Sequence, residues 1–115
     1  MLNVGVIGLG YVGLTLSIVA AKRGIYVHGI EKDREILNSI NNKKAHFFEK
    51  GLDNALSGVL NKNFLVSESF EIPNKFDYFI ITVGTPLNKG SKIPNINYVI
   101  EAINSFSQLY TGKEL

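Results

Sequence analysis

The sequence predicts an α/β fold in which helices cover a parallel sheet. Short segments of β-branched and other apolar residues alternate along the chain with segments whose apolar residues recur at helical spacing. Residues 3 to 7, the first of the expected strands, are apolar on both faces, which is typical of a central strand in a parallel sheet. A glycine-rich turn then joins this strand to the first expected helix, at residues 14 to 23.

The glycines of this turn, Gly8, Gly10 and Gly13, have the spacing G-x-G-x-x-G. The first permits a tight turn, the second lets the backbone approach a pyrophosphate, and the third allows close packing of the helix on the strand. Amides at the start of the helix, together with the positive end of its dipole, would hold the phosphates of a dinucleotide. A glycine turn that serves packing alone is the alternative. The strand and helix around the turn favour a cofactor site in a Rossmann-type, doubly wound parallel sheet.

A second strand, expected at residues 25 to 30, ends at Glu31, which lies 18 residues after Gly13. A Rossmann unit places the acid that binds the adenosine ribose near this spacing. A carboxylate at this position accepts hydrogen bonds from both ribose hydroxyls and repels a 2′-phosphate, so it favours NAD over NADP. An ordinary solvated acid at a strand end is the alternative.

Two helices are expected next. Asp33 is suited to cap the first, which ends at Asn41 and Asn42. The second covers residues 52 to 60, where apolar residues recur at i, i+3, i+4, i+7 and i+8 and predict a buried face. The polar segment between them, residues 43 to 50, is expected to be a loop.

The strongest strand signal is at residues 78 to 83, which are aromatic or β-branched almost throughout and lead into the loop Gly84-Thr85-Pro86. Ligands of open α/β sheets lie beyond the carboxyl ends of the strands, so Thr85 is expected beside the glycine loop. A simple strand-ending turn is an equal alternative. A shorter strand is expected at residues 64 to 66, and a last helix begins at Asn97 and ends at Gly112.

Composition narrows the class of protein. The chain is 45% hydrophobic and 19% charged, and its net charge of +2 comes without a basic stripe, so nucleic acid is not an expected partner. No apolar run approaches the length of a membrane span, and a cytoplasmic protein is expected. The chain lacks cysteine, and His28 and His46 lack neighbouring ligands, so no metal site is expected.

Length indicates that part of the fold is missing. A complete six-stranded dinucleotide-binding fold needs about 150 residues, whereas this chain has 115. We therefore expect residues 1 to 115 to be an incomplete domain that stops near the start of a fifth strand.

Residues 6 to 14 (VIGLGYVGL) resemble the opening of the NAD-binding domain of the UDP-glucose/UDP-N-acetylmannosamine dehydrogenase family, the nucleotide-sugar 6-dehydrogenases. Three further stretches agree with the family in order and spacing. They are residues 29 to 31 with the helix ending at residues 40 and 41, residues 48 to 52, where the family often has a Glu-Pro-Gly-Leu run, and residues 82 to 87 followed by residues 94 to 99. The resemblance covers the whole chain. It implies cofactor-binding roles for Gly8, Gly10, Tyr11, Val12, Gly13, Glu31 and Thr85, through the backbone at Tyr11 and Val12.

The resemblance also implies an activity. Enzymes of this family oxidise the C6 alcohol of a UDP-sugar to a carboxylate with two NAD molecules, for the synthesis of surface polysaccharide precursors. The reaction uses a cysteine, a lysine, an asparagine and an aspartate from later parts of the chain, so no catalytic residue is expected here. The resemblance further implies a homodimer, with the UDP-sugar bound mainly by the missing central and sugar-binding domains. The present fragment is therefore expected to be inactive.

Two positions depart from the family. The family commonly has Asp where Glu31 stands, and Lys or Arg where this chain has Ile36. Lys32 and Arg34 lie nearby and leave NADP as an alternative cofactor. The alternatives in function are a dehydrogenase of the 6-phosphogluconate or 3-hydroxyacyl-CoA type and a non-catalytic NAD-binding module. The Tyr-Val pair after Gly10 and the loop at residues 84 to 86 favour the UDP-sugar dehydrogenase.

Overall fold

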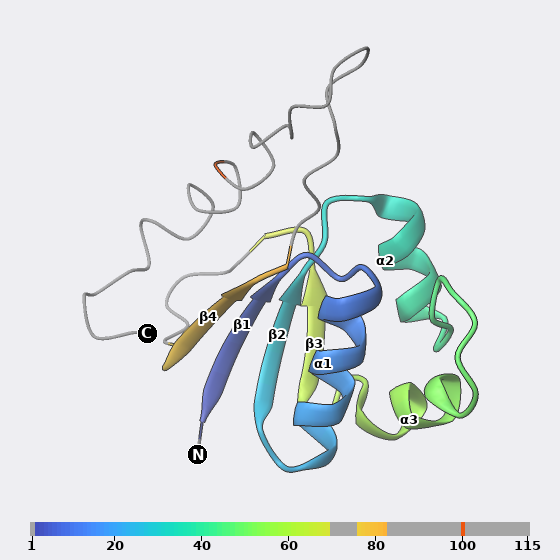
Figure 1. Cartoon of the computed structure of the whole chain (residues 1–115), viewed down its shortest axis with the longest axis horizontal. Coiled ribbons are helices and arrows are strands. Elements are labelled where there is room, and N and C mark those ends of the chain that lie inside the picture. The colour runs from blue at the N-terminus through green and yellow to red at the C-terminus, as the bar shows by residue number, and fades with distance from the viewer. Residues whose placement is uncertain (1, 70–75, 83–99, 101–115) are drawn as a thin grey trace.

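A computed structural model describes residues 2–69, 76–82 and 100 of the chain. The described strands form one four-stranded parallel sheet with the order β3-β2-β1-β4, as Figure 1 shows. This arrangement confirms the α/β class and the parallel sheet. The elements along the chain are β1 (Asn3–Ile7), α1 (Tyr11–Lys22), β2 (Tyr26–Ile30), α2 (Arg34–Asn41), α3 (Leu52–Val59), β3 (Phe64–Ser67) and β4 (Tyr78–Ile81).

Strand β1 lies in the interior of this sheet, as its apolar sequence predicts. Its Ile7 pairs with Ile30 on one side and with Ile81 on the other. Because these strands are parallel, their carboxyl ends reach the same edge of the sheet (Figure 1). The glycine turn follows β1 at this edge, and Glu31 follows β2 there.

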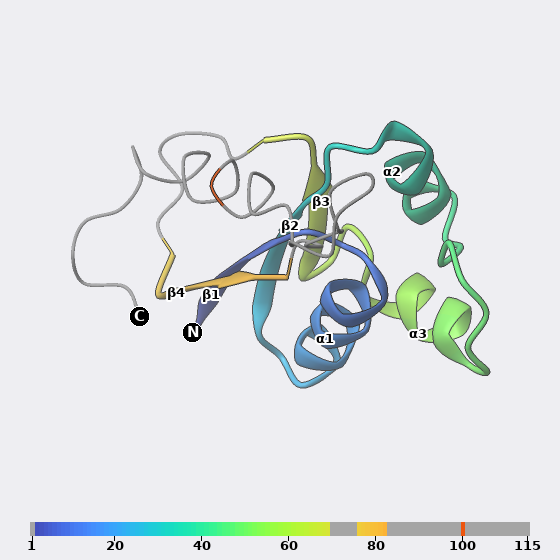
Figure 2. The ribbon, with the colours of Figure 1, turned by 45° about the horizontal axis from the view of Figure 1, so that its top comes forward.

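The core lies between the sheet and helices α1 and α3, which Figure 2 shows on the same side of the sheet. The apolar stripe predicted for α3 is confirmed, because its leucine and valine positions are buried. Each fully buried large apolar side chain stabilises the fold by roughly 1.5–3 kcal/mol. The largest side chains with less than 2% exposure are Phe64, Leu9, Leu14, Ile18, Ile40, Leu56 and Val6.

Several element boundaries differ from the prediction by one to three residues. Helix α1 begins at Tyr11, so Gly13 lies within its first turn. Strand β2 begins at Tyr26 and not at Ile25. The amide of Ile25 donates to the carbonyl of Ala20 at 3.2 Å, so Ile25 belongs to the C-terminal cap of α1. Gly24, which precedes it, has a left-handed φ of 91°.

The predicted cap of α2 is confirmed. The carboxylate of Asp33 accepts hydrogen bonds from the amides of Glu35, at 2.9 Å, and Ile36, at 3.4 Å. Of the expected last helix between Asn97 and Gly112, the described residues include Ile100, which is helical, while the rest of that range and Val83 lie outside them. Among the described helices none has the length and apolar character needed to cross a membrane.

Candidate cofactor site

The glycine turn is held between the two strands that flank β1. Gly8 has φ of 96°, a left-handed conformation that favours glycine. Its amide donates to the carbonyl of Ile30 at 2.8 Å, and its carbonyl accepts a hydrogen bond from the Thr82 hydroxyl at 2.6 Å. The tight turn expected at Gly8 is thus present, and both of its polar backbone groups are bonded.

Gly13 is needed for packing. A Cβ atom at this position would overlap the carbonyl oxygen of Gly8 and the hydroxyl of Thr82, and would lie 3.0 Å from the carbonyl carbon of Gly8. The backbone of α1 therefore lies so close to the turn that residue 13 has no room for a side chain. This is the helix-strand contact predicted for the third glycine of the motif.

Gly10 has a different environment. It is the N-cap of α1, and a Cβ atom built on it would meet nothing within 4 Å. Packing among the described residues therefore gives no reason for a glycine here, whereas open space beside the loop is what an approaching pyrophosphate requires.

The start of α1 has the features of an anion site. Its first intrahelical hydrogen bond runs from the amide of Leu14 to the carbonyl of Gly10, at 2.9 Å, so the amides of Tyr11, Val12 and Gly13 precede the helical ladder. No side chain caps this end, and its first turn has no acidic residue. The positive end of the helix dipole is consequently not neutralised from within the helix.

Glu31 lies directly against the glycine loop. Its Oε1 accepts a hydrogen bond from the amide of Leu9 at 2.9 Å, and its Oε2 accepts one from the amide of Asp33 at 3.0 Å. An ionised carboxylate offers about four lone-pair positions, so these two bonds leave capacity for ribose hydroxyls. The structure thus brings together the two segments that the sequence predicts to bind phosphate and ribose.

The loop between α2 and α3 contributes contacts that sequence reasoning missed. His46 is an exposed residue, and its Nε2 donates to the carbonyl of Leu9 at 2.8 Å. The Phe47 and Tyr11 rings have centroids 4.8 Å apart, and the Tyr11 hydroxyl donates to Oε2 of Glu49 at 2.8 Å. The tyrosine inside the motif and the aromatic-acidic run at residues 47 to 49 were the signals available in the sequence.

Glu49 also affects the acidity of Tyr11. The hydrogen bond to this carboxylate, and then its negative charge, raise the pKa of the Tyr11 phenol above the usual value of 10.0. Tyr11 therefore remains a neutral donor over the physiological range.

The residues considered for NADP lie nearby. Arg34 is paired with Glu68, with Nε and Oε1 2.8 Å apart, and its side chain is 80% exposed. Lys32 is exposed. Thr85, the remaining predicted cofactor residue, lies outside the described residues.

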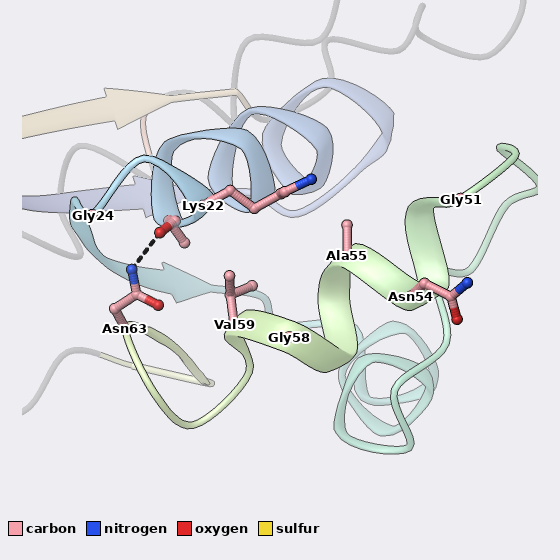
Figure 3. A pocket seen from close by; sticks show the side chains of 9 residues that line it. Lys22, Gly24, Gly51, Asn54, Ala55, Gly58, Val59 and Asn63 are labelled. Atoms are coloured by element: carbon pink, nitrogen blue, oxygen red, sulfur yellow. Dashed lines mark hydrogen bonds between the residues drawn. The ribbon is translucent and has the colours of Figure 1, made fainter.

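A separate groove of about 660 Å³ lies between the end of α1 and α3, as Figure 3 shows. At one side of it, Asn63 donates to the carbonyls of Ala21 and Ile25, which joins the start of β3 to the end of α1. Helix α1 has 12 residues, so at 1.5 Å per residue this end lies about 18 Å from the glycine loop. The groove is lined by Ala21, Lys22, Gly24, Gly51, Asn54, Ala55, Gly58, Val59 and Asn63.

Residues 2–69, 76–82 and 100 contain no group of three or more His, Asp or Glu side chains that is arranged to hold a metal ion. The titratable groups of the site instead bond to backbone amides, to a backbone carbonyl or to each other.

Comparison with known proteins agrees with this geometry. Residues 2–115 match the NAD binding domain of the UDP-glucose/GDP-mannose dehydrogenase family. The UDP-N-acetyl-D-mannosamine dehydrogenase of Campylobacter jejuni is 36% identical over 107 residues, which are 93% of this chain and 26% of that protein. The protein of the same name from Methanococcus vannielii is 39% identical over 104 residues, 87% of this chain and 24% of the relative.

The fold has a counterpart among solved structures. The UDP-N-acetyl-mannosamine dehydrogenase of Staphylococcus aureus superposes with a TM-score of 0.84 at 32% identity, over 94% of this chain and 26% of that one. The present chain therefore spans about a quarter of the length of the relatives it matches.

Proposed function

Because the chain belongs to the UDP-glucose/GDP-mannose dehydrogenase family, we propose that its glycine loop and Glu31 bind NAD for a nucleotide-sugar dehydrogenase. One observation carries the proposal: the Glu31 carboxylate is bonded to the amide of Leu9, inside the glycine loop. A ribose on this carboxylate would place the adjoining phosphates beside the start of α1.

Each part of the proposed site binds a different part of the NAD molecule. The open space at Gly10 admits the pyrophosphate, and the amides of Tyr11, Val12 and Gly13 donate to its oxygens. Glu31 accepts from the adenosine ribose, and we expect Thr85, which follows β4 along the chain, to contribute its hydroxyl and its amide. The bound NAD supplies the hydride-accepting chemistry, while the protein binds and orients it.

The charges near Glu31 support NAD rather than NADP. A 2′-phosphate would lie against the carboxylate, which repels it. Arg34, a cation that could offset this repulsion, is already paired with Glu68.

For the whole protein we propose the family's double oxidation, in which the C6 alcohol of a UDP-sugar becomes a carboxylate and two NAD are reduced. The names of the relatives support UDP-N-acetylmannosamine as substrate. UDP-glucose is the second candidate. The nucleophilic cysteine must come from outside these residues, because this chain has none. We also propose that the whole protein acts as a homodimer.

Calorimetric titration of the chain with NAD and with NADP tests the cofactor proposal. We expect tighter binding of NAD, and we expect Glu31→Gln to lose about ten- to a hundredfold in NAD affinity, the value of a charged hydrogen bond. Glu35→Gln is the matched control, because it removes the same charge from an exposed residue of the neighbouring helix. NADP binding as tight as that of NAD in the unaltered chain would refute the role of Glu31.

A further inference from the structure

The two residues on either side of Gly10 are both held by one segment, residues 46 to 49. Leu9 is bonded to His46, and Tyr11 contacts Phe47 and Glu49. None of these contacts involves Gly10 itself. They nevertheless fix the peptide units through which Gly10 is joined to the chain.

The contact with Leu9 fixes a peptide plane. The Leu9 carbonyl and the Gly10 amide belong to one planar trans peptide, so the N–H points opposite to the C=O. His46 donates to that carbonyl at 2.8 Å, and the other polar group of Leu9, its amide, donates to Glu31. The Leu9 side chain is fully buried. With Leu9 held in this way, the Gly10 amide is directed away from His46.

The contact with Tyr11 fixes the start of the helix. Its ring lies against Phe47, and Phe47 in turn has an edge-on contact with His46 at a centroid distance of 4.9 Å. Its hydroxyl is bonded to Glu49. The Tyr11 side chain is 59% exposed, so burial alone would not hold it in one rotamer.

We propose that His46, supported by the Tyr11–Glu49 pair, is a positioning residue that orients the Gly10 amide toward the cofactor pyrophosphate. The inference rests on the proposed binding of NAD at this loop. It adds the Gly10 amide to the phosphate donors proposed above and assigns the orientation of this amide to His46, which lies 37 residues from Leu9 along the chain.

The test compares two substitutions of His46 in the 115-residue chain. His46→Leu removes the donor to Leu9, whereas His46→Gln keeps an N–H at a similar distance from the backbone. Each variant is titrated with NAD and with adenosine, which has the ribose but lacks the pyrophosphate. Phe48→Ala is the control on the same segment, since the Phe48 side chain is 93% exposed.

We expect His46→Leu to bind NAD about three- to tenfold more weakly, the equivalent of one hydrogen bond, and to bind adenosine as the unaltered chain does. His46→Gln should recover most of the lost affinity, and Phe48→Ala should bind NAD normally. A merely structural role would weaken both ligands together. Unchanged NAD affinity in His46→Leu, or an equal loss for NAD and adenosine, would overturn the proposal.

A measurement without cofactor separates this inference from the proposed function. The ¹⁵N–¹H resonance of Gly10 should shift in His46→Leu and return in His46→Gln. If the unaltered chain bound neither ligand, the proposed function would fail. The Gly10 resonance would then still decide the orientation of the amide, because an unchanged resonance in His46→Leu contradicts it.

Discussion

Replacing Gly13 by alanine adds one methyl group at the closest approach between α1 and the turn. The new Cβ would overlap the Gly8 carbonyl and the Thr82 hydroxyl, so the helix must move or the hydrogen bond between those two groups must break. Overpacking costs about 1–3 kcal/mol, and the lost bond about 1 kcal/mol. The higher helix propensity of alanine returns about 1 kcal/mol. We expect a net loss of about 1–3 kcal/mol in the free energy of unfolding.

Gly10→Ala is the matched comparison, because its Cβ would meet nothing within 4 Å. Urea unfolding followed by circular dichroism should give a lower midpoint for Gly13→Ala, at unchanged slope, and a midpoint near that of the parent for Gly10→Ala. The melting temperature of Gly13→Ala should fall by about 4–8 °C per kcal/mol for a domain of this size. Equal midpoints for the two variants would refute the assignment of packing to Gly13 alone.

Gly10→Val should abolish NAD binding in calorimetry while preserving the circular dichroism spectrum, because its side chain enters the open space beside the loop; retained affinity would contradict the phosphate role. Glu49→Gln should lower the pKa of Tyr11, measured as phenolate absorbance relative to Tyr11→Phe, since the carboxylate raises it. Because the folded state favours the neutral phenol, Tyr11 contributes to stability below pH about 10. This contribution is lost as the pH rises through the pKa of Tyr11 in the folded state. Glu49→Gln and Tyr11→Phe should therefore differ least from the parent in stability at high pH. The whole protein should form about two NADH per UDP-sugar oxidised, and a ratio of one would indicate a simple alcohol dehydrogenase.

The parts of the fold that depend on local chemistry were predictable from the sequence. The spacing of Gly8 and Gly13, the cap at Asp33 and the apolar stripe of α3 each have a local physical cause, and each is present in the structure. The interior position of β1 followed from its apolar character on both faces. These features could be expected without knowing which distant residues contact them.

The contacts of His46, Glu49 and Thr82 with the glycine loop were not predictable in the same way. Each joins residues that lie far apart in the sequence, and no periodicity or propensity reports which loop lies against which. A polar loop and a lone histidine have many possible neighbours. Only the parallel order of the strands and the path between α2 and α3 bring these side chains to the loop.

The bond from Thr82 to Gly8 joins residues 74 positions apart and thereby sets the order in which the site can form. Ribosomal synthesis delivers the glycine loop first, yet the residue that fixes its carbonyl emerges only after β4. Contacts of such long sequence separation form late, because closing the intervening chain costs entropy. In pulsed hydrogen exchange during refolding, we expect the Thr82 amide, which donates to the carbonyl of Ile7 at 2.8 Å, to gain protection after the amides within α1. Simultaneous protection would mean that β4 joins the sheet while α1 forms, and that the Gly8 carbonyl is fixed early.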